Sequence, residues 1–464
     1  MKKSIILLII MCGLCLSTLY IDLIADAQQH SSTIADWPMF CNNLAHTGVT
    51  SDIGPKQPTE LWSYVGDEFE YFVHSSAVVV NGVVYVSSKQ RDGDMGYIYA
   101  FNAYTGKKIW SYSADGAGWS SPAVSENVLY IGCSDNVYAL NASTGNKLWN
   151  HPVGGTSMSS AAVVNGIVYI GSADSNVYAF DALTGNKIWN YTTYNSVHSS
   201  PAVVDEVVYV GSDDGNVYAL NALTGAKLWN YTTNGQRIFY PYDRWVDGPN
   251  AVVSSPAVVN GVVYVGSIGG DVYALNASTG DKIWSYYTMP SRDGGGGDTF
   301  GVSASPAVSD GIVYIGSVEG PFYAFDALTG DQVWTCSDPA FWRILSSATV
   351  ADGVVYVGSY WDVYAFNATS GLQLWNFSTT NRIRTSPCIY DGVLYIGSID
   401  GTFYAIGTPL SAPPASDSSS FNVLLFMWVG LVVIIIVAVV LIAAFFLKLK
   451  KAQKLSYLYG TVTK

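Results

Sequence analysis

The amino-acid sequence predicts an all-β fold, an eight-bladed β-propeller of four-stranded antiparallel blades, followed by one transmembrane helix. One phrase recurs eight times and ends in Tyr-Ala at Tyr99, Tyr138, Tyr178, Tyr218, Tyr273, Tyr323, Tyr364 and Tyr404. Five of the seven intervals are 39 to 41 residues long, which is the length of one such blade. A tryptophan recurs with the same period, at Trp62, Trp110, Trp149, Trp189, Trp229, Trp284, Trp334 and Trp375.

Each repeat contains four short strands. In the copy that begins at Ser199, the expected strands are residues 201–204, 207–211, 216–221 and 227–231, which are rich in Val, Tyr, Leu and Trp. The first two strands are joined by a two-residue turn. In six other copies this turn is Asn-Gly or Asp-Gly, pairs that tolerate the positive φ angles of a tight hairpin. The repeat is therefore an antiparallel meander.

The N-terminal end of the repeat region is expected to close the ring. The last repeat, residues 385–406, lacks the strand that carries the recurring tryptophan, whereas Trp62 stands upstream of the first full repeat. Leu61–Tyr64 would supply the missing strand and remove the exposed sheet edges that an open array carries.

These repeats resemble the tryptophan-docking repeat of pyrroloquinoline quinone (PQQ)-type propellers. The resemblance covers about residues 59–407 and rests on segments such as 218–229, in which a Thr-Gly pair stands four residues before a Trp. Residues 37–48 also resemble a lead-in segment of archaeal surface proteins of this superfamily. The resemblance implies that each Trp packs between adjacent blades, so these residues are interpreted as core rather than as a ligand platform.

The sequence lacks the features that this resemblance implies for catalysis. PQQ-dependent dehydrogenases carry an adjacent Cys-Cys pair, calcium ligands and an acidic base, and no Cys-Cys occurs here. Motifs of serine hydrolases, zinc proteases and phosphate-binding loops are also missing. We therefore expect no catalytic residue, cofactor or metal site. A reduced quinoprotein dehydrogenase and an envelope protein-assembly factor are the alternatives to a non-catalytic binding module.

The termini predict export and anchoring in a membrane. Residues 1–27 are expected to form a signal peptide, with an uncleaved signal-anchor as the alternative. The lead-in (28–58), the propeller (59–407) and a Pro/Ser-rich linker (408–420) follow. Residues 421–447 carry no charge and are long enough to span a bilayer, and the lysines behind them place the tail, residues 448–464, in the cytoplasm. The propeller would then lie outside the cell membrane.

Charge argues against a nucleic-acid partner. The chain has a net charge of −13, and because seven of its 22 basic residues lie at the two ends, residues 22–420 hold 15 basic residues against 35 acids. Cys41, Cys133, Cys336 and Cys388 show no metal-type spacing. One disulfide and small buried side chains are the alternatives for them, and burial is favoured for Cys133.

Two sets of residues are candidates for binding a protein or glycan partner. The links between blades and the links between second and third strands share one face, and the expanded links, residues 89–96, 232–251, 288–302 and 337–344, all lie there. Their candidate residues are Tyr240, Tyr242, Arg244, Trp245, Trp342 and Arg343. Alternatively, these loops merely cover the channel mouth.

The second set precedes the recurrent Ser-Ser or Ser-Pro pair of each repeat. These variable positions are His74, Trp119, Met158, His198, Val253, Ser303, Leu345 and Arg384. We expect them at the rim of the central channel, where His74, Trp119, His198 and Arg384 would meet a partner. Relaxed packing in a wide ring explains the variety equally well.

Six Asn-x-Ser/Thr sequons are candidates for N-glycosylation, at Asn141, Asn190, Asn230, Asn276, Asn367 and Asn376. For Asn141, Asn276 and Asn367, local hydrogen bonding in a turn is the alternative explanation.

Overall fold

A computed structural model describes residues 36–409, except residues 67–69, 73, 92, 94, 156–157, 235–237, 241–243, 247–249, 289–300, 319–320 and 337–343. Of residues 238–240 and 244–246 only the backbone is described. The predicted signal peptide, transmembrane segment and tail, with most of the linker, lie outside the described residues. Among the residues that are described, no helix is long and apolar enough to cross a membrane.

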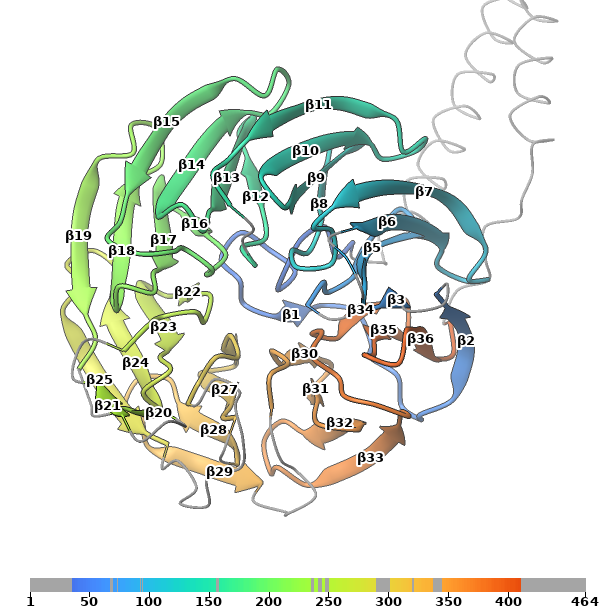
Figure 1. Cartoon of the computed structure of the whole chain (residues 1–464). Coiled ribbons are helices and arrows are strands. Elements are labelled where there is room, and N and C mark those ends of the chain that lie inside the picture. The colour runs from blue at the N-terminus through green and yellow to red at the C-terminus, as the bar shows by residue number, and fades with distance from the viewer. Residues whose placement is uncertain are drawn as a thin grey trace, which may run out of the picture. The chain divides into compact units, whose positions relative to one another are not determined.

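The described chain is a ring of eight four-stranded antiparallel blades, as the sequence predicts (Figure 1). The strands of each blade are given from the channel outward. Blade one contains β4 (Val78–Val80), β5 (Val83–Gln90), β6 (Met95–Asn102) and β7 (Lys108–Asp115), and blade two contains β8 (Ala123–Ser125), β9 (Val128–Cys133), β10 (Asn136–Asn141) and β11 (Lys147–Pro152). Blade three contains β12 (Ala162–Val164), β13 (Ile167–Gly171), β14 (Asn176–Asp181) and β15 (Lys187–Thr192), and blade four contains β16 (Ala202–Val204), β17 (Val207–Gly211), β18 (Asn216–Asn221) and β19 (Lys227–Thr232). Blade five contains β22 (Ala257–Val259), β23 (Val262–Gly266), β24 (Asp271–Asn276) and β25 (Lys282–Tyr287), and blade six contains β26 (Ala307–Ser309), β27 (Ile312–Gly316), β28 (Phe322–Asp326) and β29 (Gln332–Cys336). Blade seven contains β30 (Thr349–Ala351), β31 (Val354–Gly358), β32 (Asp362–Asn367) and β33 (Gln373–Ser378), and blade eight contains β34 (Cys388–Tyr390), β35 (Val393–Gly397), β36 (Thr402–Gly407) and β2 (Glu60–Val65).

The eighth blade confirms closure by the N-terminal strand. Strand β2 pairs antiparallel with β36, with Trp62 opposite Ala405 and Ser63 opposite Tyr404. The first and last parts of the propeller are thus held in one sheet (Figure 1).

The two faces of the ring carry different connections. On the hairpin face lie the turns between first and second strands and between third and fourth strands; they are linked within a blade, as where Ala182 N donates to Gly166 O at 2.8 Å. On the loop face lie the links between second and third strands and the links between blades, joined where Thr193 N donates to Ser175 O at 2.7 Å.

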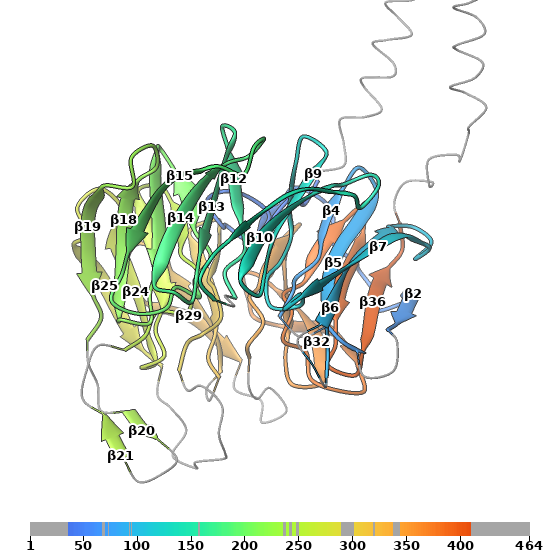
Figure 2. The same ribbon diagram turned by 45° about the horizontal axis from the view of Figure 1, so that its top comes forward.

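Two expanded links differ from the loops that the sequence predicts. In the first blade, half of residues 89–96 extend β5 and β6, which pair as far as Lys89 and Gly96. The link after blade four contains the hairpin β20 (Ile238–Tyr240) and β21 (Arg244–Val246), which projects beyond the loop face in Figure 2. Short β3 (Glu70–Tyr71) pairs with β5, and β1 (Val49–Thr50) pairs in parallel with β30.

Adjacent blades are joined by a tryptophan and a tyrosine that share one acceptor. Trp189 Nε1 and Tyr169 Oη both donate to Ala222 O of the next blade, at 2.9 and 3.1 Å. Gly225 lies on the face of the Trp189 ring, where an added Cβ would come within 2.6 Å of the ring, and its φ is +70°. The turn therefore requires glycine at this position, because only glycine combines a positive φ with the absence of a Cβ. This arrangement confirms the interblade packing of the recurring tryptophans.

The junction between blades seven and eight uses a substitute acceptor. Blade eight has no turn between its third and fourth strands, because β36 and β2 come from opposite ends of the repeat region. Pro55 O takes the place of the missing carbonyl and accepts from Trp375 Nε1 at 3.1 Å and Tyr356 Oη at 3.2 Å. The segment before β2 therefore completes the interblade pattern.

Replacing Trp189 with Ala should destabilise the propeller. The change leaves a cavity between two blades, for which a loss of about 3 to 5 kcal/mol of unfolding free energy is expected. Denaturant titration of the solubilised chain measures it, with Tyr194→Ala as the control because Tyr194 is 92% exposed. Equal stabilities of the two variants would contradict the interblade role.

Deleting residues 58–66 should expose the free edge of β36 and cause aggregation, because an unpaired strand edge templates further pairing. Size-exclusion chromatography of the solubilised chain reports this. A variant that keeps the elution volume and melting temperature of the full chain would show that β2 is not needed for closure.

Candidate functional site

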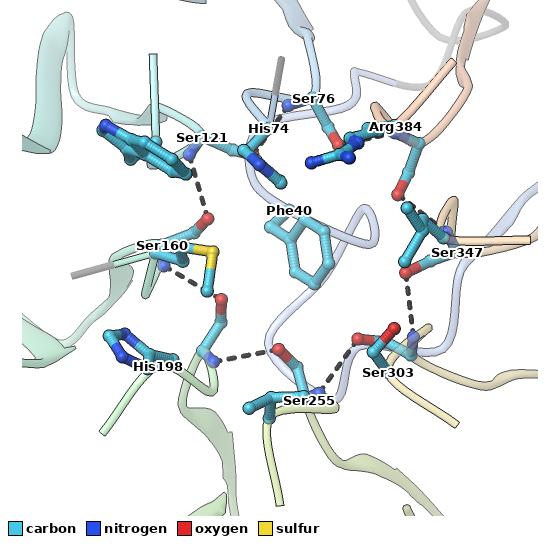
Figure 3. A pocket seen from close by; sticks show the side chains of 17 residues that line it. Phe40, His74, Ser76, Ser121, Ser160, His198, Ser255, Ser303, Ser347 and Arg384 are labelled. Atoms are coloured by element: carbon cyan, nitrogen blue, oxygen red, sulfur yellow. Dashed lines mark hydrogen bonds between the residues drawn. The ribbon is translucent and has the colours of Figure 1, made fainter. Parts of the chain in front are cut away.

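A closed circle of serines surrounds the central channel. The backbone N–H of one serine in each blade donates to the side-chain oxygen of the equivalent serine in the next, at 2.9 to 3.0 Å. The circle runs through Ser76, Ser121, Ser160, Ser200, Ser255, Ser305, Ser347 and Ser386, and returns to Ser76 (Figure 3). Every member is buried, so each bond satisfies polar groups that burial removes from solvent.

The variable residues two positions before these serines line the mouth of the channel. All eight, His74, Trp119, Met158, His198, Val253, Ser303, Leu345 and Arg384, border a cavity of about 170 Å³ and are half-buried. The expectation that they reach the channel rim is confirmed. Binding of a partner there stays a prediction.

Residues 36–57 of the lead-in segment close the channel from the hairpin face. They contact the blades in turn through bonds from Val124 N to Pro38 O, Val203 N to Leu44 O, Val258 N to Ala45 O, Val308 N to Thr47 O and Val350 N to Gly48 O, at 2.7 to 2.9 Å. Trp37 exchanges two backbone bonds with Val79, and Asp52 Oδ2 accepts from Asp391 N at 3.0 Å. Phe40 projects into the middle of the serine circle (Figure 3). The cavity is therefore open toward the loop face and floored by this segment.

Cationic and aromatic side chains cluster at one side of the mouth. The His74 and Trp119 rings stack with centroids 4.8 Å apart, and Lys89 Nζ lies 4.7 Å from the Trp119 centroid. Burial, and then the charges of Arg384 and Lys89, lower the pKa of His74 from its ordinary 6.5 to about 3. His74 is therefore neutral at pH 7, and the positive charge of this side comes from Arg384 and Lys89.

A second polar pair lies in blade four. His198 Nε2 is 3.5 Å from Asp213 Oδ2. Burial raises the pKa of Asp213, an effect that the neighbouring His198 opposes. Within the described residues, His198 Nδ1 and Ser303 Oγ have no hydrogen-bond partner. Their buried polar atoms are available to a ligand that enters the mouth.

Sequence reasoning missed a further aromatic group on the loop face. Tyr360 and Trp361 stack with centroids 5.5 Å apart, Arg382 lies 4.6 Å from the Tyr360 centroid, and Trp361 is 57% exposed. Exposed Tyr194 lies on the same face after blade three. Trp361 falls in a three-residue link, one residue shorter than the link in blades three, four, five and eight, and only its Tyr-Trp pair could have marked it.

The structure describes only part of the predicted loop set. Tyr240 lies in β20, and Arg244 and Trp245 lie in β21, where Tyr240 pairs with Arg244. Tyr242, Trp342 and Arg343 lie outside the described residues. The mouth residues and the Trp361 group therefore carry the candidate site.

The sequons fall into two structural classes. Asn141 Oδ1 accepts from Thr144 N and Oγ1 in an exposed turn, and the turns of Asn276 and Asn367 are bonded similarly. Asn190, Asn230 and Asn376 are exposed on outer strands, where each Nδ2 donates to the third strand. Glycosylation of either class stays a prediction.

The described cysteines Cys41, Cys133, Cys336 and Cys388 form no disulfide, and Cys133 is buried as expected. In the same part of the chain, no group of three or more His, Cys, Asp or Glu side chains is placed to hold a metal ion.

Comparison with a model of PQQ-like repeats, described as outer membrane protein assembly factor BamB, matches residues 94–253, 243–340 and 323–408. The chain belongs to this BamB family. The comparison with curated protein sequences found no match.

Solved structures share the fold of this BamB-family chain. BamB from Moraxella catarrhalis is 20% identical with a TM-score of 0.61, covering 76% of this chain and all of that one. A europium-containing methanol dehydrogenase is 16% identical, with a TM-score of 0.64 and coverages of 80% and 98%. Quinohemoprotein alcohol dehydrogenase from Comamonas testosteroni is 17% identical, with a TM-score of 0.60 and 82% of each chain covered. Enzymes and an assembly factor thus share this architecture.

The residues at the mouth do not fit PQQ with calcium, the pair that the resemblance to dehydrogenases implies. Calcium requires several oxygen ligands, usually with carboxylates among them, and the described residues that line the cavity include no Asp or Glu. Its volume is below the roughly 300 to 1,000 Å³ of a typical cofactor site, and Phe40 occupies its centre.

The free energy of unfolding should fall as the pH drops from about 6.5 toward 4, in part because of His74. The folded state keeps His74 neutral, whereas His74 of the unfolded chain binds a proton below about pH 6.5. Acid therefore stabilises the unfolded state relative to the folded state. Denaturant titration of His74→Gln should show a shallower fall than the unsubstituted chain. Identical slopes would contradict the described environment of His74.

Proposed function

We propose that this chain is an exported, single-pass membrane protein whose propeller binds a protein or glycan partner through its loop face, without catalysing a reaction. The observation that carries the proposal is the grouping of cationic and aromatic side chains on that face. His74, Trp119 and Lys89 form one stack, and Tyr360, Trp361 and Arg382 form another. Exposed Trp, Tyr and Arg are the side chains that most often dominate binding energy at interfaces.

The distribution of arginine supports a binding role for the same face. Between residues 22 and 420, all seven arginines fall by sequence in links of the loop face, at Arg91, Arg237, Arg244, Arg292, Arg343, Arg382 and Arg384. Arginine recognises carboxylates in a planar, bidentate geometry and stacks on aromatic rings. In a chain with an excess of acids, this arrangement favours a partner that presents acidic groups to the mouth.

The rigidity of the ring supports a binding role. The mouth residues are attached to short inner strands whose serines are bonded in a closed circle, so their positions are preorganised. Among the described residues, the cavity lining has no carboxylate, which favours binding over quinoprotein chemistry. Incubation with PQQ and calcium, followed by a dye-linked alcohol oxidation assay, separates the two; turnover above the untreated chain would reject the non-enzymatic proposal.

Changing the loop face should weaken capture of the partner. We expect a Trp361→Ala, Arg382→Ala double variant to lose about tenfold or more in affinity, because one hot-spot side chain contributes roughly 2 kcal/mol. The full chain in nanodiscs serves as bait for native envelope proteins, and the captured partner is then titrated against each variant.

The matched control changes an exposed apolar residue and a cation on the hairpin face, Ile53→Ala with Lys56→Ala. It should bind as the unsubstituted chain does. Full capture by the loop-face variant, or an equal loss in both variants, contradicts the proposal.

A further inference from the structure

Exposed aliphatic side chains gather on the outer rim of the hairpin face. Eleven of the large apolar residues exposed among the described positions lie there, 46% to 86% exposed. They are Ile109, Leu148, Leu183, Ile188, Leu223, Leu228, Ile283, Leu328, Val333, Leu372 and Leu374. Single exposed residues of this kind are ordinary, whereas a rim of them shared by seven blades indicates a binding surface.

Two local structures place these side chains on the rim. Leu183, Leu223 and Leu328 occupy the turn between the third and fourth strands. The second residue of each fourth strand lies in a β-bulge; in blade three, Trp189 and Lys187 have partners in β14, and Ile188 between them has none. The bulge turns the aliphatic side chain out of the blade.

Lysines accompany this rim. Lys108, Lys147, Lys187, Lys227 and Lys282 each begin a fourth strand, next to the bulge residue, and all are exposed. The exposed aromatic residues Tyr194, Tyr287 and Trp361 lie on the loop face instead. Aliphatic side chains beside lysines are the composition of surfaces that lie in the headgroup region of a bilayer, where the lysine stem covers apolar surface and the ammonium contacts phosphate.

Both ends of the described chain lie on this same face. Asp36 Oδ1 accepts from the turn residue Asn81 N at 2.9 Å. At the other end, Gly407 N donates to Thr59 O at 2.6 Å, beside the turn that contains Gly392. Residues 410–420 then lead to the uncharged residues 421–447. Eleven residues span at most roughly 40 Å, so this length limits how far the apolar run can begin from the end of the described chain.

We propose that the hairpin face docks on the surface of a lipid bilayer, with the aliphatic rim in the headgroup region and the loop face turned away from the membrane. This inference rests on the membrane anchoring in the proposed function. It does not depend on the partner. Carboxylates also lie on this face, Asp205, Glu206 and Asp310 in the turns nearer the channel and Asp281 and Asp331 in the rim turns, so the aliphatic side chains and not the net charge carry the contact.

Depth-dependent quenching tests the orientation. The full chain is labelled with a fluorophore at Leu183→Cys or Leu328→Cys on the rim, and at Tyr194→Cys or Trp361→Cys on the loop face. It is reconstituted in vesicles of equimolar phosphatidylcholine and phosphatidylglycerol that contain a headgroup nitroxide lipid. The rim labels should be quenched several-fold more than the loop-face labels. The chain without added cysteine gives the background, to which half-buried Cys336 contributes, whereas Cys41, Cys133 and Cys388 are buried.

A Leu183→Asp, Leu328→Asp variant tests the apolar contact itself. A label at the exposed turn residue Ser143, introduced as Ser143→Cys, should lose quenching in this variant while the circular dichroism spectrum is unchanged. Equal quenching of both faces, stronger quenching of the loop face, or a chain that does not float with the vesicles overturns the proposal. Rim labels that are shielded from water but not quenched by the lipid would mean that a protein covers the face, and would overturn it as well.

Discussion

The closed circle of serine hydrogen bonds is the constraint on which the rest of the structure depends. Each blade contributes one backbone donor and one side-chain acceptor, so the circle is complete only if the eighth blade meets the first, as it does where Ser386 N donates to Ser76 Oγ at 2.9 Å. That meeting requires β2 to pair with β36. Closure therefore rests on a strand from the start of the chain, and it positions the variable residues at one mouth.

Closure also explains the lead-in segment. The inner strand of each blade has a free edge toward the channel, and buried backbone N–H groups need acceptors. The carbonyls of Pro38, Leu44, Ala45, Thr47 and Gly48 satisfy five of these donors in succession. Gly48 fits between blades six and seven because a Cβ there would lie 2.9 Å from that of Ala307. The same segment supplies Pro55 O at the junction where a turn is missing, so it serves as floor of the cavity and as part of the interblade contacts.

Sequence periodicity predicted most of the fold, including the strands of blade four, the pairing of Trp62 with the last repeat, and the eight mouth residues. These features follow from the repeat, because aligning the eight copies shows which residue of one blade corresponds to which residue of another. What occurs once was not predicted. The path of residues 36–57, the acceptor at Pro55 and the hairpin β20–β21 have no counterpart in other blades. The stacking of His74 on Trp119 and of Tyr360 on Trp361 depends on side-chain positions that spacing does not contain.

We propose that the two faces of one ring meet different surroundings, a partner at the loop face and lipid at the hairpin face. Site-specific photocrosslinking in cells that produce the full chain measures this directly. A photoreactive amino acid is placed at Tyr194 or Trp361 on the loop face, and at Leu183 or Leu372 on the hairpin rim. The account predicts that the loop-face positions crosslink to one discrete protein or glycan species and that the rim positions crosslink to lipid. Protein adducts from the rim with none from the loop face would contradict it.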